Sequence, residues 1–187
     1  MPLDLVKNAE LFAKKKHSGM TRKDGTDYSK HLEAVVNRLK SLSVVDEEIL
    51  CAGWLHDTME DTDTSFDDLF ERFGSRVAVL VSSLSKDISL PKKQKEQAYI
   101  KQLEEASSDA KLVKLCDISA NLSDLKRYST SKSKRLRYLK LKRRNLVAIK
   151  GDLLESKDYP KGIILLESVN KILKKYVFKH LKFFYSK

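Results

Sequence analysis

The sequence predicts an all-α protein, a bundle of roughly eight to ten helices. Apolar residues recur at helical spacing almost throughout the chain. Only six glycines and three prolines occur in 187 residues, which is too few turns for a β-sandwich or barrel. The composition, 41% hydrophobic and 34% charged, is typical of a globular chain. We expect one domain over residues 1–187, with a basic helical extension from about residue 130.

Helix-start signals divide the first part of the chain. Asp4 is a good N-cap for a helix that begins at Leu5. Residues 17–29 are polar, contain two glycines and are expected to form a loop. A second helix is expected over about residues 30–42, and a third begins near residue 46 and leads into the pair His56-Asp57.

The next elements are marked by caps and breakers. Residues 60–64 are expected to form an acidic turn. Ser65 and Asp68 then make a capping box for a short helix that Gly74 ends. Another helix is expected over residues 77–84.

The last elements are longer. Pro91 can open a helix, and Asp109 is expected to cap a long apolar helix that ends near Leu125. A basic helix is expected over about residues 133–154, and Pro160 separates it from a final helix. We expect the apolar stripe of that final helix to pack on the core rather than on a membrane surface.

The net charge of +11 is unevenly placed. Residues 126–187 hold 19 Lys and Arg against four Asp and Glu, whereas residues 1–125 hold 18 against 22. This polarity indicates an anionic partner or substrate. A solvated helix face beside an anionic pocket is one interpretation of the basic region, and a nucleic-acid contact is the other. No nucleic-acid motif accompanies it, so we do not expect a nucleic-acid partner.

The apolar runs, the first residues and the cysteines of the sequence indicate the cellular compartment. No apolar run approaches the roughly 20 residues that span a bilayer, and the first residues lack the pattern of a signal peptide. Two cysteines, Cys51 and Cys116, lie in apolar stretches. We therefore expect a cytoplasmic protein with two buried, reduced thiols. The oligomeric state stays open.

Residues of the types that bind metals occur on three separate predicted helices: His31, His56, Asp57 and Asp117. Two imidazoles and two carboxylates suit a divalent ion such as Mn, Fe or Zn. A His-Asp dipeptide alone is more often a surface pair. Asp117 lies among apolar neighbours and needs a partner, and with Asn121 and Asp124 it forms a polar stripe on one helix face. On spacing alone, a metal site and a structural role are both open.

Further acids follow the His-Asp pair. Asp57, Glu60, Asp61 and Asp63 lie within seven residues. If the helix continues, Asp57 and Asp61 share one face, with Glu60 beside them. Carboxylates this close repel one another, and a bound dication removes the repulsion. The alternative is a solvated helix N-terminus.

Three stretches carry motifs. Residues 13–31 contain A-K-K-K-H-S-G and R-K-D-G-T-D-Y-S-K-H, residues 55–62 are L-H-D-T-M-E-D-T, and residues 110–122 contain A-K-L-V-K-L-C-D and N-L. Together they resemble the hydrolase domain of RelA/SpoT-type alarmone enzymes, which are HD-domain metal-dependent phosphohydrolases. The resemblance covers about residues 5–128, so the chain looks like a stand-alone small alarmone hydrolase with an HD-type helical bundle.

This resemblance implies roles residue by residue. The four ligands of a manganese ion would be His31, His56, Asp57 and Asp117. The pair that orients and deprotonates the attacking water would be Glu60 and Asp61. The residues that hold the nucleotide would be Arg22, lying along the base, with Lys23, Tyr28 and Asn121. The implied reaction is hydrolysis of the 3′-pyrophosphate of ppGpp or pppGpp to GDP or GTP and pyrophosphate.

The chain also departs from the motifs. Met20, Asp27 and Leu32 replace residues usual in the family, and residues 118–120 differ beside the base pocket. Base selectivity is therefore open, and ppApp or NADPH are alternative substrates. A basic binding module with a vestigial site is another alternative. The complete set of ligand and acid residues argues against that decay.

Overall fold

The computed structural model describes residues 4–125, 130–155 and 159–185, with side chains up to Tyr176. Its helices are α1 (Leu5–Lys16), α2 (Ser29–Ser41), α3 (Glu47–Leu55), α4 (Thr58–Asp61), α5 (Phe66–Phe73), α6 (Ser75–Leu84), α7 (Lys92–Glu105), α8 (Ser108–Asp124), α9 (Lys132–Glu155) and α10 (Pro160–Tyr185). Within these ranges the only extended pairing is an isolated bridge between Thr21 and Asp27. The all-α prediction is confirmed.

Most of the predicted caps are present. The carboxylate of Asp4 accepts a hydrogen bond from the backbone of Val6, and Ser65 forms the capping box that starts α5. The prediction for α8 is wrong, because Ser107 and not Asp109 is its N-cap. Ser107 satisfies the amide of Ala110, which leaves Asp109 in the first turn of the helix, where its carboxylate accepts from Arg76.

The structure differs from the expected loops in two connections between helices. The predicted acidic turn over residues 60–64 is partly helical, because α4 adds one turn with Asp57 at its N-cap position. Helix α6 begins directly after Gly74, whose φ of 85° is a conformation that glycine adopts without a steric penalty. The chain therefore reverses between α5 and α6 at a single residue.

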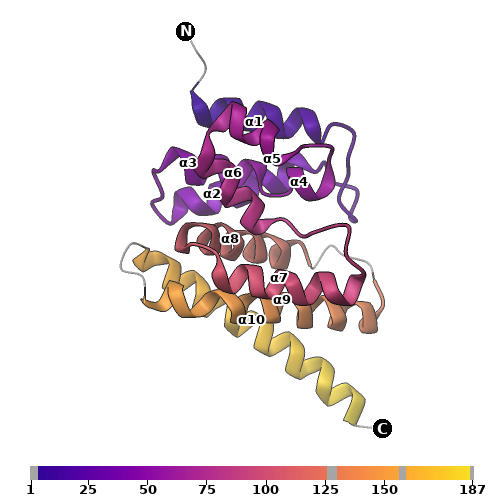
Figure 1. Cartoon of the computed structure of the whole chain (residues 1–187). Coiled ribbons are helices and arrows are strands. Elements are labelled where there is room, and N and C mark those ends of the chain that lie inside the picture. The colour runs from indigo at the N-terminus through magenta and orange to yellow at the C-terminus, as the bar shows by residue number, and fades with distance from the viewer. Residues whose placement is uncertain (1–3, 126–129, 156–158, 186–187) are drawn as a thin grey trace.

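Helix α8 is the centre of the molecule. It packs against α2, α3 and α6 on one side and against α9 and α10 on the other. Figure 1 shows α1 to α6 gathered in the upper part of the molecule and α7, α9 and α10 in the lower part. Nearly all of α8 between Ala110 and Leu122 is buried. The polar side chains of Lys114, Asp117 and Asn121 are therefore held inside the bundle, at the junction of the two groups of helices.

The first part of α10 packs on the core, as predicted. Leu166, Val169 and Leu173 are buried, whereas the side chains of Val177, Leu181 and Phe184, which continue the predicted stripe, lie outside the described residues. The helices of the described residues include none with the length and apolar character needed to span a membrane.

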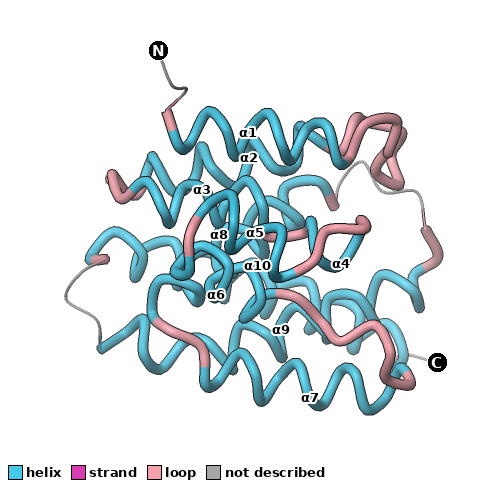
Figure 2. Tube along the Cα trace, turned by 45° about the horizontal axis from the view of Figure 1, so that its top comes forward, coloured by secondary structure: helices cyan, strands magenta, loops and turns pink. Residues whose placement is uncertain are grey.

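Both cysteines are free and buried. Burial raises the pKa of each thiol to about 12, so both stay protonated near neutral pH. The prediction of two buried thiols is confirmed. Figure 2 shows the loops that join the helices, among them the long connection over residues 17–28 between α1 and α2.

Candidate active site

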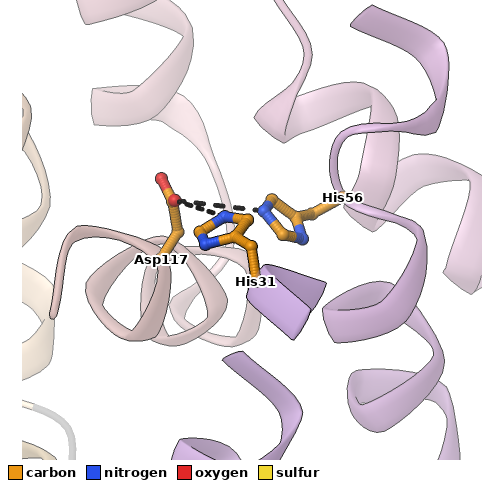
Figure 3. A group of neighbouring side chains, drawn as sticks. All are labelled: His31, His56 and Asp117. Atoms are coloured by element: carbon orange, nitrogen blue, oxygen red, sulfur yellow. Dashed lines mark ion pairs between the residues drawn. The ribbon is translucent and has the colours of Figure 1, made fainter. Parts of the chain in front are cut away.

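Three buried side chains from three helices meet beside α8. His31 comes from α2, His56 follows the last residue of α3, and Asp117 comes from the middle of α8. The Nε2 atoms of His31 and His56 lie 3.4 and 3.9 Å from Oδ1 of Asp117. One ligand atom from each residue lies within 4.8 Å of the others, and Figure 3 shows the two imidazoles turned toward the carboxylate.

Asp57 also reaches this cluster. Its Oδ2 lies 3.2 Å from Nε2 of His56 and 3.7 Å from Nε2 of His31. The structure therefore brings all four predicted ligands together, although they are up to 86 positions apart in the chain. The close approach of α3 to α2 depends on Gly53, where a Cβ would lie 2.7 Å from Cδ1 of Leu39.

The donor atoms suit a divalent ion. Nδ1 of His56 lies 2.9 Å from the carbonyl oxygen of Gly53, so Nδ1–H donates there and the Nε2 lone pair faces the carboxylates. The Nε2 atoms of both histidines are buried without a hydrogen-bond partner. Buried nitrogens of this kind need a partner, and two imidazoles with carboxylates are a ligand set for a first-row dication.

Asp117 uses its two oxygens differently. Oδ1 faces the histidines, whereas Oδ2 lies 2.9 Å from Nζ of Lys114 and 3.5 Å from Nζ of Lys142. Burial disfavours the charged carboxylate, but the two lysines outweigh burial and hold the pKa of Asp117 well below its usual range. Burial also lowers the pKa of Lys142 to about 8, although Asp117 opposes this shift. Asp117 therefore stays ionised and available to a cation.

The two histidines differ in their protonation. Burial lowers the pKa of His31, which favours the neutral form that binds metals. Burial also acts against a charged His56, but the neighbouring Asp57 carboxylate raises its pKa overall. A dication at the cluster would compete with that proton for the Nε2 atom of His56.

The predicted acid pair lies at the edge of the cluster. The hydroxyl of Tyr28 lies 2.8 Å from Oδ2 of Asp57 and 2.5 Å from Oδ2 of Asp61, so this tyrosine links the ligand to the acid. Burial, with the charges of Asp57 and Glu60, raises the pKa of Asp61. The ammonium of Lys86 donates to Oε1 of Glu60 at 2.6 Å. Each acid is thus oriented by a separate partner.

Three of the predicted nucleotide-binding residues form one network. Nη2 of Arg22 donates to Oδ1 of Asn121 at 2.7 Å, and the guanidinium lies 5.5 Å from the ring centre of Tyr28. Asn121 in turn donates to the carbonyl oxygen of Asp117 at 3.0 Å. The fourth, Lys23, lines a cavity of about 890 Å³.

Four further side chains contact the predicted site residues. Lys114 and Lys142 hold Asp117, Lys86 holds Glu60, and His17 stacks on Tyr28 with ring centres 4.6 Å apart. A signal existed for Lys114, which lies one turn before Asp117 in an apolar helix. Lys142 lies on another helix, and no local pattern distinguishes it from its basic neighbours.

Comparison with known proteins places this geometry in context. The HD domain family matches residues 9–146. Guanosine-3′,5′-bis(diphosphate) 3′-pyrophosphohydrolase MESH1 of Danio rerio is 42% identical over 119 residues, which cover 62% of this chain and 66% of that protein. The chain thus matches just under two thirds of this relative's length.

A longer relative and a solved structure of similar length also match the chain. Guanosine-3′,5′-bis(diphosphate) 3′-pyrophosphohydrolase of Aquifex aeolicus is 38% identical over 135 residues, which cover 70% of this chain and 19% of that protein. A solved structure of a metazoan orthologue of SpoT, described as hydrolysing ppGpp and acting in starvation responses, superposes with a TM-score of 0.80 and 29% identity. That superposition covers 91% of this chain and 96% of the other.

Proposed function

The chain belongs to the HD domain family, as its motifs predicted, and we propose that it is a metal-dependent hydrolase of the 3′-pyrophosphate of ppGpp and pppGpp. The products would be GDP or GTP and pyrophosphate. The relatives named for this reaction, at 42% and 38% identity, support the proposal. The observation that carries it is the buried cluster of His31, His56 and Asp117 with two acids at its edge.

We assign the metal to His31, His56, Asp57 and Asp117. The orphaned Nε2 atoms and the ionised Asp117 support this assignment. A bound dication would lower the pKa of a water molecule and neutralise phosphate charge. Manganese is the ion that the family resemblance favours, and the nitrogen and oxygen donor set is compatible with it.

The acids at the edge of the cluster supply the proton chemistry. Glu60 and Asp61 are assigned to orient the attacking water and take its proton. Attack at the phosphorus attached to the 3′ oxygen breaks that P–O bond and releases pyrophosphate, and the 3′ oxygen leaves as a hydroxyl after gaining a proton. Lys86 fixes one acid and Tyr28 the other, so both are held before substrate arrives.

The remaining groups are assigned to the nucleotide. Arg22 is held by Asn121 with its guanidinium beside Tyr28, which leaves a planar cation to stack on a purine. Lys23 and the basic residues of α9 face the cavity, where they can pair with phosphate oxygens.

Two free, buried thiols support a cytoplasmic location.

One assay tests the proposal. The purified protein is incubated with ppGpp, ppApp and NADPH, each with Mn²⁺ or with a chelator, and the products are separated by anion exchange. We expect Mn²⁺-dependent release of pyrophosphate from ppGpp. Turnover of ppApp or NADPH alone would keep the metal site and change the substrate. Binding of all three without turnover would indicate a vestigial site.

A further inference from the structure

The cavity that Lys23 lines is strongly cationic. Among the described residues that line its 890 Å³ are eight lysines and arginines and one acid, Glu96. The carboxylate of Glu96 lies 4.0 Å from Nη1 of Arg144. The lining also includes Tyr138 and Leu141, which give the cavity an apolar wall.

The cavity adjoins the metal cluster at two points. Lys23, in its lining, follows Arg22, which is hydrogen-bonded to Asn121. Tyr138, also in its lining, lies 5.6 Å from the ammonium of Lys142, and this ammonium lies 3.5 Å from Oδ2 of Asp117. A nucleotide whose 3′ group lies at the cluster therefore has this cavity as the space for its other end.

Four of the lining cations lie along a single helix. Lys134, Arg137, Lys140 and Arg144 all line the cavity from α9. They span eleven residues, or about 15 Å of helix, at spacings of three or four residues, so they form one row on a single face. These four side chains are exposed, and the ammonium groups that hold Asp117 are instead those of Lys114 and Lys142. A row of this length is suited to a chain of phosphates rather than to one phosphate.

We infer that the cavity holds the 5′-phosphate chain and makes the enzyme favour substrates with more 5′-phosphates. This inference rests on the proposed function and adds a specificity to it. Each added phosphate brings a further negative charge near exposed cations, and the attraction is screened by salt. Arg137 and Lys140 are the specificity residues, because they lie in the middle of the row.

The first test uses three guanosine 3′-pyrophosphates that carry a 5′-mono-, di- or triphosphate. We expect kcat/KM to rise about three- to fivefold with each phosphate added, and this gain to shrink at high ionic strength. Hydrolysis of all three at equal kcat/KM, or in the reverse order, overturns the inference and leaves the proposed function intact. Hydrolysis of none of them in the presence of Mn²⁺ overturns the proposed function.

The second test removes charge from the row. The double variant Arg137→Gln/Lys140→Gln is expected to reduce the gain from the third phosphate to less than about twofold while metal binding is unchanged. Arg143→Gln is the matched control, because Arg143 is exposed on the same helix but does not line the cavity. We expect it to keep the wild-type order. If Arg143→Gln flattens the series as much as the double variant, overall charge and not the cavity sets the preference.

Discussion

The acidic first two thirds of the chain and its basic last third contribute opposite chemistry to one site. Helices α2, α3 and α8 supply the histidines and carboxylates of the cluster, and the short α4 carries Glu60 and Asp61. Helix α9 supplies Lys142 and one wall of the cationic cavity. The first region gathers nitrogen and oxygen donors suited to a cation, whereas α9 adds positive charge suited to an anion.

The two regions meet at Asp117. One oxygen of this carboxylate faces the histidines, and the other faces Lys114 and Lys142. A phosphate ester at this junction would have a metal on one side and ammonium groups on the other. Because α9 packs directly on α8, a lysine from the basic region lies within a few ångströms of the histidine and carboxylate cluster from the acidic region.

The largest effect is expected when one of the proposed metal ligands is removed. Asp117→Ala should abolish both activity and bound metal, because one ligand is lost and Lys114 is left with an unpaired buried charge. His31→Ala, His56→Ala and Asp57→Ala should behave alike. Metal content is measured after gel filtration, and a thermal scan with added Mn²⁺ should show no stabilisation. An Asp117→Ala protein that retains metal contradicts the site as assigned.

The next effect separates chemistry from metal binding. Glu60→Gln and Asp61→Asn should leave metal content intact and lower kcat by about 10²–10⁴-fold, as expected for loss of a general base. Single-turnover rates with Mn²⁺ present measure this change. Wild-type rates in both variants would mean that another group takes the proton from water.

Much of the fold could be predicted because its signals are local. Asp4, Asp46 and Ser65 act as caps as their sequence context indicates. The error at Asp109 arose because two residues suited to capping, Ser107 and Asp109, lie two positions apart. The helical turn of α4 was missed because its sequence is acidic and only four residues long, so it lacks the apolar periodicity by which longer helices are found.

The site was predictable to a lesser extent. The histidines and acids fall in motifs, and the structure brings them together, although their roles stay proposals. Lys86, which holds Glu60, falls in a stretch that resembles the family but was assigned no role, and Lys142, which holds Asp117, carries no such signal. Their positions depend on how α9 and the connection after α6 pack on the rest of the bundle. Contacts of this kind are tertiary, and no single stretch of sequence encodes them.

A smaller effect is expected when the ammonium group of Lys142 is removed. Lys142→Met keeps an apolar stem of similar length and removes the ammonium near Asp117. We expect kcat/KM to fall about tenfold at pH 7, since one cation near the phosphates is lost. Because the pKa of Lys142 is about 8, the wild-type protein loses this charge as pH rises through 8, so its kcat/KM should decline there. The variant should lack that decline, and an identical pH profile in both proteins would exclude the role.

The smallest effect is expected at Arg22, which we assign to the base. Arg22 comes from the loop before α2, whereas the metal ligands lie on or beside helices, so Arg22→Ala should leave metal content unchanged. A guanidinium that stacks on the base acts alike in the ground and transition states, so KM should rise about fivefold with little change in kcat.

The same variant tests how the base is recognised. Stacking discriminates little between guanine and adenine, so Arg22→Ala should lose comparable kcat/KM on ppGpp and on ppApp, if the latter is a substrate. Selectivity would then depend on hydrogen bonds to the base edge, for which Asn121 is placed by its bond to Arg22. Lys23→Ala is the companion variant, since a cation on a phosphate should lower kcat as well as raise KM. Unchanged kinetics of Arg22→Ala on every nucleotide would show that this loop does not hold the base.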